Sequence, residues 1–430
     1  MGRELRKRGH AVALGSHAEW RSAAAEASLD FIELGPDLEA LGGSEAVLRR
    51  ASATRDGKAW WLQNALLTML PAMTNQTIAM LDNFDAVVSH PWAHHAKIAA
   101  QVTSKDWINT ILEPAMFFSE FDRAVSFAPL SEALSLFGNV TPNYLRNQIR
   151  KSVEPLNQRI LEVGRSFGVD KWDGEPLFEG QFSPQMNLAL MSRVFVEPRA
   201  DWPSNTIVTG FPYHDTLPTE EDETTMEWIG GGSKPIVFAL GDLGNRESSE
   251  LTVNFREAIQ AAGLRGLIVG SPLVGDRSLE GSIREVRRAD LRDVLPQSQV
   301  LVHGGSVGMV AQAMRSGIPS ISLPASEYEE DHAQRLVHEG CGTMIARARA
   351  SSEKLIEGFK QVRQNPEILE YAELIKQHIQ YESGAVVAAD AVECLAIGKE
   401  IEKRLPVSQE RVSRSEIQAL WQSSLGKRAA

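Results

Sequence analysis

The chain has 430 residues, which is too long for one ordinary hydrophobic core, so two domains are the first expectation. Hydrophobic residues make up 43% and charged residues 23% of the chain, as in soluble globular enzymes. The formal net charge of −12 argues against binding to nucleic acid. Only two cysteines occur, Cys341 and Cys394, and neither belongs to a CxxC pair. A disulfide framework and a zinc site are therefore disfavoured, and this cysteine usage fits a cytoplasmic protein.

No segment of the sequence predicts insertion into a membrane. No apolar run approaches the roughly 20 residues of a membrane-spanning helix. The start of the chain, MGRELRKRGHAVALGS, is charged and has no apolar signal core followed by a small-residue cleavage site. We therefore expect these residues to be part of the mature protein.

The first part of the chain, residues 1–214, alternates between helical and strand-like patterns. A basic helical stretch at 2–8 precedes the strand-like run HAVAL, and a longer helical pattern covers 143–168. Further strand-like runs lie at 29–34 (LDFIEL), 85–89 (DAVVS) and 192–197 (SRVFVE). Strands that alternate with helices predict βαβ units around a parallel sheet.

An acidic segment separates this part from a second α/β pattern. Residues 215–234, DTLPTEEDETTMEWIGGGSK, have few apolar groups that could join a core and contain three consecutive glycines, so we predict an interdomain linker. The second pattern covers 235–395, with strand-like runs at 235–240, 266–269 and 299–302 and helical patterns at 254–262, 353–363 and 384–397. Residues 396–430 are predicted to form a polar tail with one candidate helix at 415–423. The patterns together predict an α/β fold with two Rossmann-like domains facing a cleft.

The most informative segment is 301–324, LVHGGSVGMVAQAMRSGIPSISLP, in which an apolar run meets His-Gly-Gly-Ser and then a helical pattern. Unpaired backbone N–H groups at a helix start favour a phosphate or another anion. Gly304 and Gly305 have no Cβ atoms and allow the backbone to approach a ligand, while His303 and Ser306 can donate hydrogen bonds. A plain strand-to-helix turn with a capping serine explains the segment equally well when it is taken alone.

The surroundings of this turn carry a family resemblance. The run LPQSQVLVHGGSVGMVAQAMRSGIPSISLPASEYEEDHAQRLVHEGCG resembles the donor-binding signature of the GT-B glycosyltransferases. The group in question uses nucleotide sugars and includes bacterial rhamnosyltransferases, sterol glucosyltransferases and antibiotic glycosyltransferases. RELRKRGHAV, DAVVSHPWAHHAKIAA, ADWPSNTIVTGFPYHD and PIVFALGD are similar to family segments in the same order and spacing. The resemblance covers nearly the whole chain to residue 395 and is strongest over 285–345.

The resemblance implies a nucleoside-diphosphate sugar of the UDP or dTDP type as co-substrate, with no metal and no further cofactor. It implies that the His-Gly-Gly turn binds the diphosphate, that the loop at Asp290 contacts the nucleobase, and that Tyr328-Glu329 replaces an acidic-glutamine pair that binds the sugar. The implied donor-site residues are His303, Gly304, Gly305, Ser306, Gly308, Gly241, Asp242, Asp290, Leu291, Glu327, Tyr328 and Glu329. A carboxylate at Asp242 would repel a diphosphate unless it is paired or turned away.

The chain also departs from the family pattern. The spacing between the His-Gly-Gly turn and Gly-Ile-Pro is one residue longer, so either His303 or Gly304 faces the phosphate. The family's first strand, and the loop that usually carries the His or Asp that deprotonates the acceptor, have no counterpart in this sequence. Loss of a central parallel strand would expose apolar neighbours such as Val12 and Leu14. The sequence therefore identifies no catalytic base.

Three histidines cluster in SHPWAHHAK. On a helix His94 and His95 point about 100° apart, which does not match the i,i+4 pair of a zinc protease, and no metal site is predicted. Surface or capping histidines are the simplest interpretation. In the interpretation that the resemblance favours, His90, Trp92 and His94 line the acceptor pocket. His90 is also a candidate for a substitute base, because histidine titrates near neutrality.

Two functions fit these observations. The first is an inverting glycosyltransferase that moves a hexose-type sugar to a hydroxyl of a small-molecule, lipid or natural-product acceptor. A lipid acceptor would bring the protein into peripheral contact with a membrane. The second is a catalytically impaired nucleotide-sugar-binding or auxiliary protein, which the absent base region and the Tyr328-Glu329 pair motivate.

Overall fold

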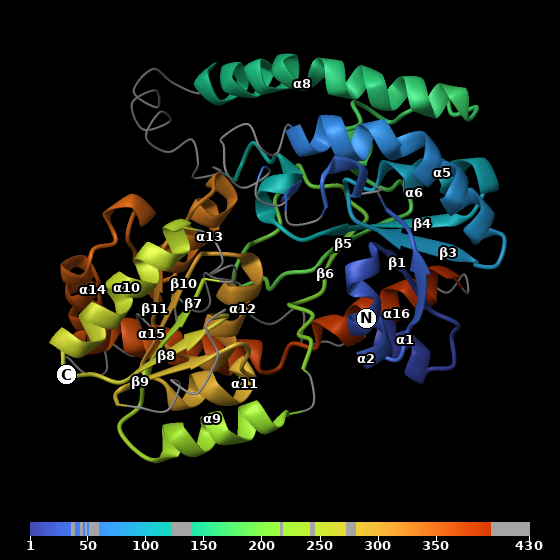
Figure 1. Cartoon of the computed structure of the whole chain (residues 1–430). Coiled ribbons are helices and arrows are strands. Elements are labelled where there is room, and N and C mark those ends of the chain that lie inside the picture. The colour runs from blue at the N-terminus through green and yellow to red at the C-terminus, as the bar shows by residue number, and fades with distance from the viewer. Residues whose placement is uncertain are drawn as a thin grey trace, which may run out of the picture.

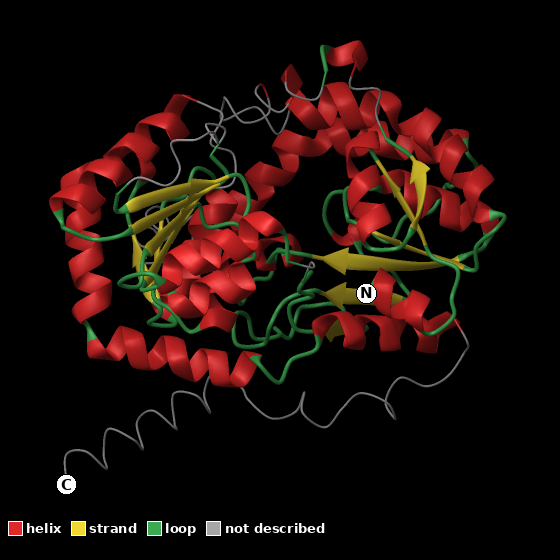
Figure 2. Ribbon diagram, turned by 60° about the horizontal axis from the view of Figure 1, so that its bottom comes forward, coloured by secondary structure: helices red, strands yellow, loops and turns green. Residues whose placement is uncertain are grey.

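The computed structural model describes residues 1–35, 39–43, 46–47, 50, 60–122, 140–215, 218–240, 246–271 and 281–396. These residues form two α/β lobes that lie side by side, each built around parallel strands (Figure 1, Figure 2). The elements of the N-terminal lobe are α1 (Gly2–Lys7), β1 (Ala13–Ser16), η1 (Ala18–Trp20), α2 (Arg21–Glu26), β2 (Asp30–Glu33), η2 (Glu39–Leu41), η3 (Leu62–Leu66), α5 (Leu67–Leu81), β3 (Ala86–Ser89), α6 (His94–Thr103), β4 (Asp106–Ile111), η4 (Pro114–Phe117), α8 (Val140–Ser166), η6 (Glu179–Gln181), β5 (Met186–Ala189) and β6 (Thr206–Val208).

The elements that follow along the chain build the C-terminal lobe, except for the last helix. They are α9 (Glu220–Gly230), β7 (Ile236–Ala239), α10 (Arg246–Ala261), β8 (Gly266–Val269), β9 (Ile283–Val286), α11 (Leu291–Val294), η7 (Leu295–Gln297), β10 (Val300–His303), α12 (Val307–Ser316), β11 (Ser320–Ser322), α13 (Glu327–His338), β12 (Gly342–Met344), η8 (Arg347–Arg349), α14 (Ser352–Gln364), α15 (Pro366–Ile379) and α16 (Gly384–Ala396).

The C-terminal lobe holds a six-stranded parallel sheet with the order β12-β11-β10-β7-β8-β9. Its first strand in the chain, β7, therefore lies beside its fourth, β10, and the winding direction reverses between them. The register pairs Ala239 with His303, so both strands end at the same level. Doubly wound sheets bind ligands outside the carboxyl ends of the strands at such a switch point.

Side chains of β7 alternate between the two faces of this sheet. Ile236 and Phe238 pack with residues of α10 and α14, whereas Val237 and Ala239 pack on the opposite face with residues of α9 and α12. A parallel strand covered by helices on both faces has no polar side and reads as a continuous apolar run. This is why the run PIVFAL was sufficient to predict the strand.

The strands of the N-terminal lobe form two separate parallel sheets, β1-β2 and β3-β4-β5-β6. Among the described residues, β1 pairs only with β2, and β3 pairs only with β4. Val12 and Leu14 are half-buried, and Val12 packs in one cluster with Val88 and Ile108. The described strands of this lobe therefore do not form one continuous sheet.

The longest helix, α8, lies across the outer side of the N-terminal lobe (Figure 1). Its Leu156 and Ile160 pack in one apolar cluster with Leu70 of α5 and Ile98 of α6. This cluster fixes α8 over the helices that precede β3 and β4.

One apolar cluster joins the two lobes. Side chains that follow the carboxyl ends of β4, β5 and β6 pack against α12, α13 and α15. Its larger members are Met116, Phe117, Met191, Phe195, Trp202 and Phe211 from the N-terminal lobe and Val310, Met314, Leu336, Ile375 and Ile379 from the C-terminal lobe. Full burial of one such side chain contributes about 1.5–3 kcal/mol, so hydrophobic burial holds the lobes together.

The last described helix, α16, returns to the N-terminal lobe, where Ala388 packs in one cluster with Met186 of β5. Arg8 of α1 forms an ion pair with Asp390 of α16 at 2.7 Å. The structure thus differs from the predicted donor domain at 235–395, because the end of that range belongs to the core of the other lobe. The predicted tail from 397 onward, with its candidate helix, lies outside the described residues.

The segment predicted as a linker, 215–234, contains a helix instead. α9 begins with a reciprocal capping box between Thr219 and Asp222. Ile229 is 3% exposed and joins the core of the C-terminal lobe. The acidic residues gather in the first helical turn, where the helix dipole favours negative charge. The acidic composition therefore marked a helix start.

The strand predicted at 192–197 is irregular chain, and β5 ends before it at Ala189. Val194, Phe195 and Val196 are each 3% exposed and lie in the cluster between the lobes. Burial at a lobe interface produced the same apolar run that a buried strand would have. No described helix is long and apolar enough to cross a bilayer.

Candidate functional site

The His-Gly-Gly-Ser turn lies at the switch point of the C-terminal sheet. β10 ends at His303, beside the end of β7, and the ten-residue helix α12 begins at Val307 with Ser306 as its N-cap. The turn thus joins the carboxyl end of a central strand to the amino end of a helix. This is the placement that the sequence predicted for an anion site.

The side chain of His303 is fully buried. Its Nδ1 accepts a hydrogen bond from the backbone N–H of Gly305 at 3.0 Å, and its Nε2 lies 3.3 Å from Oγ of Ser322. Burial, with a smaller contribution from the nearby His332, lowers the pKa of His303 to about 3, so the ring is neutral. Because Nδ1 accepts, the ring proton sits on Nε2 and is donated to Ser322.

These contacts correct the predicted role of His303. A side chain that is buried and hydrogen-bonded on both ring nitrogens does not reach a ligand outside the strand ends. His303 instead holds the shape of the turn from inside the lobe. Gly304 is buried as well, beside the carboxylate of Glu329 and the carbonyl oxygen of Leu240, so which residue of the turn faces a phosphate stays a prediction.

The two glycines of the turn are needed for different reasons. Gly305 has a φ of +95°, and a Cβ there would lie 2.7 Å from the backbone oxygen of Glu329. A Cβ on Gly304 would lie 3.5 Å from Oε1 of Glu329 and 3.6 Å from the carbonyl oxygen of Leu240, which follows β7. Gly305 is therefore required by backbone conformation and space, and Gly304 keeps the turn close to β7 and α13.

The amino end of α12 is open. Ser306 is exposed, and its side chain makes no capping hydrogen bond. A Cβ on Gly308 would meet no described atom within 4 Å. The first N–H groups of an α-helix have no partner within the helix, and the helix dipole adds partial positive charge at this end. These groups can together bind a diphosphate.

The start of α13 faces the same turn. Oε2 of Glu329 accepts a hydrogen bond from the backbone N–H of Ala325 at 2.8 Å, and this carboxylate borders Gly304. Tyr328 is half-buried, and the side chain of Glu327 lies outside the described residues. Glu329 is thus the residue of the predicted sugar-binding group that the structure brings to the turn.

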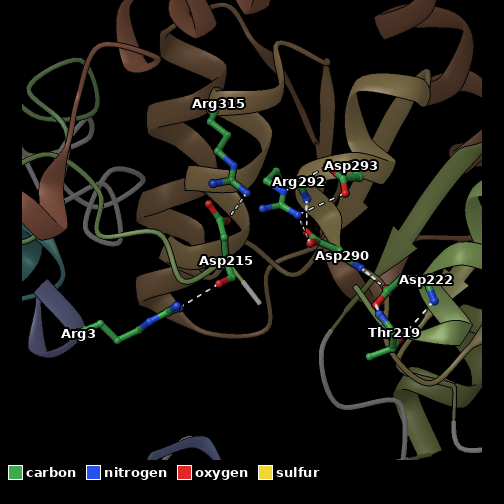
Figure 3. Close-up of polar contacts among 8 residues, drawn as sticks. All are labelled: Arg3, Asp215, Thr219, Asp222, Asp290, Arg292, Asp293 and Arg315. Carbon is green, nitrogen blue, oxygen red and sulfur yellow. Dashed lines mark hydrogen bonds and ion pairs between the residues drawn. The ribbon is translucent and has the colours of Figure 1, made fainter. Parts of the chain in front are cut away.

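The loop before α11 is held by α9 (Figure 3). The backbone N–H of Asp290 donates to Oδ1 of Asp222 at 2.7 Å, and the side chain of Asp290 caps α11 by accepting from the N–H of Arg292. The N–H of Asp290 is therefore occupied, and contact between a nucleobase and another backbone group of this loop stays a prediction. Leu291, which follows it, is the first residue of α11. Gly241 and Asp242 lie outside the described residues.

His90, which follows β3, has an occupied acceptor nitrogen. Its Nδ1 accepts a hydrogen bond from the backbone N–H of Trp92 at 3.2 Å, and burial lowers its pKa to about 4. The neutral ring therefore carries its proton on Nε2 and has no free lone pair for a substrate proton. This geometry argues against His90 as the catalytic base.

His94 belongs to the interior of the N-terminal lobe. It is 3% exposed, its ring lies 6.5 Å from that of Trp172, and burial lowers its pKa to about 3. A histidine packed in this way does not line a pocket, so the predicted acceptor role does not fit its position. Trp92 is half-buried and contacts the His90 ring edge to face at 5.9 Å. The described residues contain no cluster of metal-ligating side chains.

Sequence reasoning missed an ion pair that joins the lobes near the turn. Arg335 of α13 contacts Asp331 at 2.9 Å and Asp122 of the N-terminal lobe at 2.9 Å. One helical turn earlier, Nδ1 of His332 lies 3.0 Å from the carbonyl oxygen of Gly305. Asp122 and Arg335 are 213 residues apart in the chain, so no local pattern could have linked them.

Comparisons with known proteins agree with this arrangement. Residues 271–392 match the family model of the erythromycin biosynthesis protein CIII-like C-terminal domain. The O-mycaminosyltylonolide 6-deoxyallosyltransferase of Streptomyces fradiae is 26% identical over 414 residues, which cover 91% of this chain and 92% of the relative. A sterol 3-beta-glucosyltransferase of Arabidopsis thaliana is 23% identical over 354 residues, which cover 80% of this chain and 54% of the relative. The crystal structure of the glycosyltransferase VinC in complex with dTDP has a TM-score of 0.62 and 18% identity, with 92% of this chain and 95% of that chain covered.

The two α/β lobes, with an open helix start at the switch point of one sheet, define a protein of the GT-B fold. The matched domain family and the relatives that extend along most of the chain identify it as a glycosyltransferase of the antibiotic and sterol type. The resemblance drawn from the sequence is thereby confirmed at the level of family and fold.

Proposed function

We propose that this glycosyltransferase moves a hexose-type sugar from a nucleoside-diphosphate sugar of the UDP or dTDP type to a hydroxyl of a small-molecule, lipid or natural-product acceptor. We further propose inversion at the anomeric carbon. One observation carries the proposal: the open amino end of α12, with Ser306 as an exposed N-cap, lies at the switch point of the sheet. The deoxyallosyltransferase among the relatives and the dTDP complex of VinC support a donor of this type.

The N–H groups of the first turn of α12 would hold the diphosphate and stabilise the negative charge that develops as the sugar–phosphate bond breaks. A hydrogen bond to a charged group contributes about 1.5–3 kcal/mol, and several would converge here. His303 would act indirectly, because it keeps the N–H of Gly305 turned inward and the helix start exposed. The carboxylate of Glu329 would accept hydrogen bonds from sugar hydroxyls on the side of Gly304.

A second function, nucleotide-sugar binding without transfer, is favoured by one specific observation. The acceptor hydroxyl must lose its proton during transfer, and the candidate base His90 has its acceptor nitrogen occupied by Trp92. In an auxiliary protein, the donor turn would bind nucleotide while no acceptor reacted. Binding and turnover therefore have to be measured separately.

The first experiment compares Ser306→Asp with the wild type in calorimetric titrations with dTDP and UDP. Aspartate caps a helix as well as serine does, so α12 should stay folded. The added carboxylate would face the diphosphate, and we expect nucleotide affinity to fall by at least about tenfold. Ser351→Asp is the matched control, because Ser351 caps α14 in the same lobe. Unchanged nucleotide binding by Ser306→Asp would reject this site.

The second experiment follows release of nucleoside diphosphate from a panel of dTDP- and UDP-sugars in the presence of hydroxylated acceptors. Sugar transfer that is lost in Ser306→Asp and retained in Ser351→Asp supports the transferase. The anomeric configuration of the product, read by NMR, tests inversion. Tight nucleotide binding without turnover on the whole panel would favour the auxiliary function.

A further inference from the structure

The N-terminal lobe contains a pocket of about 620 Å³ beneath α8. Its volume lies within the range of small-molecule sites. The described residues that line it come from η4 and the segment after it, α8, the loop between α8 and η6, η6, and the loops before β5 and β6. None of the described residues of the donor turn or of α12 contributes to it.

The pocket lies apart from the donor turn. Ser183 and Pro184 lead into the amino end of β5, and Pro203 to Asn205 lead into the amino end of β6. The residues after the carboxyl ends of the same strands pack against the C-terminal lobe. Phe117, Phe118 and Glu120 follow the carboxyl end of β4, so the lining extends along this side of the lobe from one end of the strands to the other. Because every described lining residue belongs to the N-terminal lobe, a ligand in the pocket would not occupy the diphosphate position.

Aromatic rings form the apolar wall of the pocket. Phe117 stacks on Phe182 with ring centroids 6.0 Å apart, and Phe118 meets Phe178 at 4.8 Å. The guanidinium of Arg150 lies 4.4 Å above the ring of Phe178, so this wall already holds one cation against an aromatic face. An aromatic wall of this kind suits a ligand with a ring or chain and a positive charge.

The polar lining is predominantly acidic. Among the described lining residues, Glu120, Asp173, Glu179 and Asp201 are acidic and Arg150 is the one basic residue. Asp201 accepts hydrogen bonds from Oγ of Ser119 and the N–H of Glu120, and Asp173 lies in the field of the buried Lys97. Arg150 is itself paired with Glu179 and, at 3.2 Å, with Glu175 behind the wall. The lining therefore attracts a cation more strongly than an anion.

A buried lysine supports the wall from inside the lobe. Lys97 is 1% exposed and donates a hydrogen bond to the carbonyl oxygen of Gly180. Its ammonium lies 4.4 Å from the ring of Trp172 and 5.1 Å from that of Trp107. These contacts fix the chain that carries Asp173, Phe178 and Glu179, so the pocket is largely preformed and a ligand would not have to order it.

We propose that this pocket binds a molecule that combines an apolar ring or chain with a protonated amine, at a site separate from that of the nucleotide sugar. The aromatic rings take the apolar part, and the carboxylates take the ammonium group. The proposal does not depend on the donor sugar or on turnover, because it concerns a different cavity.

The test uses three probes with the same apolar body and different charge: 4-phenylbutylamine, 4-phenylbutan-1-ol and 4-phenylbutyrate. Binding is measured by ligand-observed NMR on the full chain at pH 7 and low salt, with and without saturating dTDP. We expect the amine to bind roughly fivefold or more tighter than the alcohol, and the carboxylate to bind weakest. Saturating dTDP should leave the amine in place. Equal binding of the three probes, or displacement by dTDP, would overturn the proposal.

Matched variants locate the binding. Ser204→Phe should fill the pocket and abolish binding of all three probes, since Ser204 is an exposed lining residue. Asp173→Asn should reduce the advantage of the amine over the alcohol by several-fold and leave alcohol binding unchanged. Asp170→Asn, an exposed neighbour outside the lining, should bind as the wild type does. Amine binding that survives Ser204→Phe in a variant with unchanged Tm would place the probe elsewhere and reject the assignment.

Discussion

The two lobes of this glycosyltransferase are built on different principles. The C-terminal lobe has one continuous sheet with apolar helices on both faces, and among its described residues the start of α12 lies open at the switch point. The N-terminal lobe divides its strands between two sheets and buries ionisable groups, among them His94, His95 and Lys97. The comparison teaches that a site made by one turn is visible in the sequence, whereas a lobe assembled from distant segments is not.

The polar interior of the N-terminal lobe offers the largest expected effect. Lys97→Ala should lower the free energy of unfolding by about 3 kcal/mol or more, because it leaves a cavity between two tryptophans and an unpaired carbonyl at Gly180. Lys97→Met keeps most of the side-chain volume and should cost less. Lys151→Ala on the exposed side of α8 is the control and should stay within about 0.5 kcal/mol of the wild type. Chemical denaturation measures all three.

Lys97 also predicts a pH dependence. Burial lowers its pKa from 10.5 to about 8, so above pH 8 the folded protein binds fewer protons than the unfolded chain. Stability contributed by this group should therefore rise between pH 8 and 10.5. The unfolding free energy of the wild type, relative to that of Lys97→Met, should therefore increase over this pH range. A difference that is independent of pH would contradict the burial of the ammonium.

The segment between α15 and α16 leads from the C-terminal lobe back to the N-terminal lobe. Its contribution to stability should fall as the pH rises, which is the opposite of the effect expected for Lys97. Oε1 of Glu382, between α15 and α16, accepts a hydrogen bond from Oγ of Ser192 at 2.6 Å, and its carboxyl packs against Gly210. Burial raises the pKa of Glu382 from 4.5 to about 7. The folded state keeps a proton there that the unfolded chain releases, so this stability is complete below pH 4.5 and is lost as the pH rises through 7.

Each unit of pKa difference corresponds to about 1.4 kcal/mol of stability. The stability lost when Glu382 ionises is therefore at most about 3 kcal/mol. Glu382→Gln should flatten the dependence and stabilise the protein at pH 8 relative to the wild type. Glu357→Gln on the exposed side of α14 is the control and should keep the wild-type profile. Thermal unfolding between pH 4 and 8 provides the comparison, and a Glu382→Gln profile parallel to that of the wild type would refute it.

The donor turn should respond to the shape of its backbone. Gly305→Ala would force a Cβ to 2.7 Å from the backbone oxygen of Glu329 at a positive φ, and we expect a loss of about 2 kcal/mol in stability with at least tenfold weaker dTDP binding. Gly308→Ala, inside α12 with open space around its Cβ, should raise stability by up to about 1 kcal/mol. Equal stability of the two variants would show that the turn is not strained as described.

The smallest expected effect concerns the contact between the lobes. Asp122→Asn removes one charge from Arg335, which keeps its partner Asp331, so we expect a loss of about 1 kcal/mol. Because α13 also carries His332, which contacts Gly305, dTDP affinity should fall by a few-fold. Asp106→Asn, in the same lobe and away from the interface, is the control. Unaltered dTDP affinity in Asp122→Asn would separate the interlobe contact from the donor site.

Local patterns predicted the C-terminal lobe well. The runs at β7 and β8, the glycine turn and the amphipathic α12 depend on neighbours within a few residues, and each was recognised from the sequence alone. Gly305 is an example, because a strand that turns directly into a helix at this point requires its positive φ. The same local logic misjudged α9, where a capped helix start resembled an acidic linker.

The sequence by itself determined the family, the α/β class and the place of the turn that joins β10 to α12, because backbone geometry and short spacings specify them. Only the tertiary structure decided which way His303 points, how Asp222 occupies the N–H of Asp290, and which segments build the pocket beneath α8. The run 192–197 shows the physical reason: an apolar side chain is buried equally well in a sheet or between lobes, and only the arrangement of distant segments distinguishes the two.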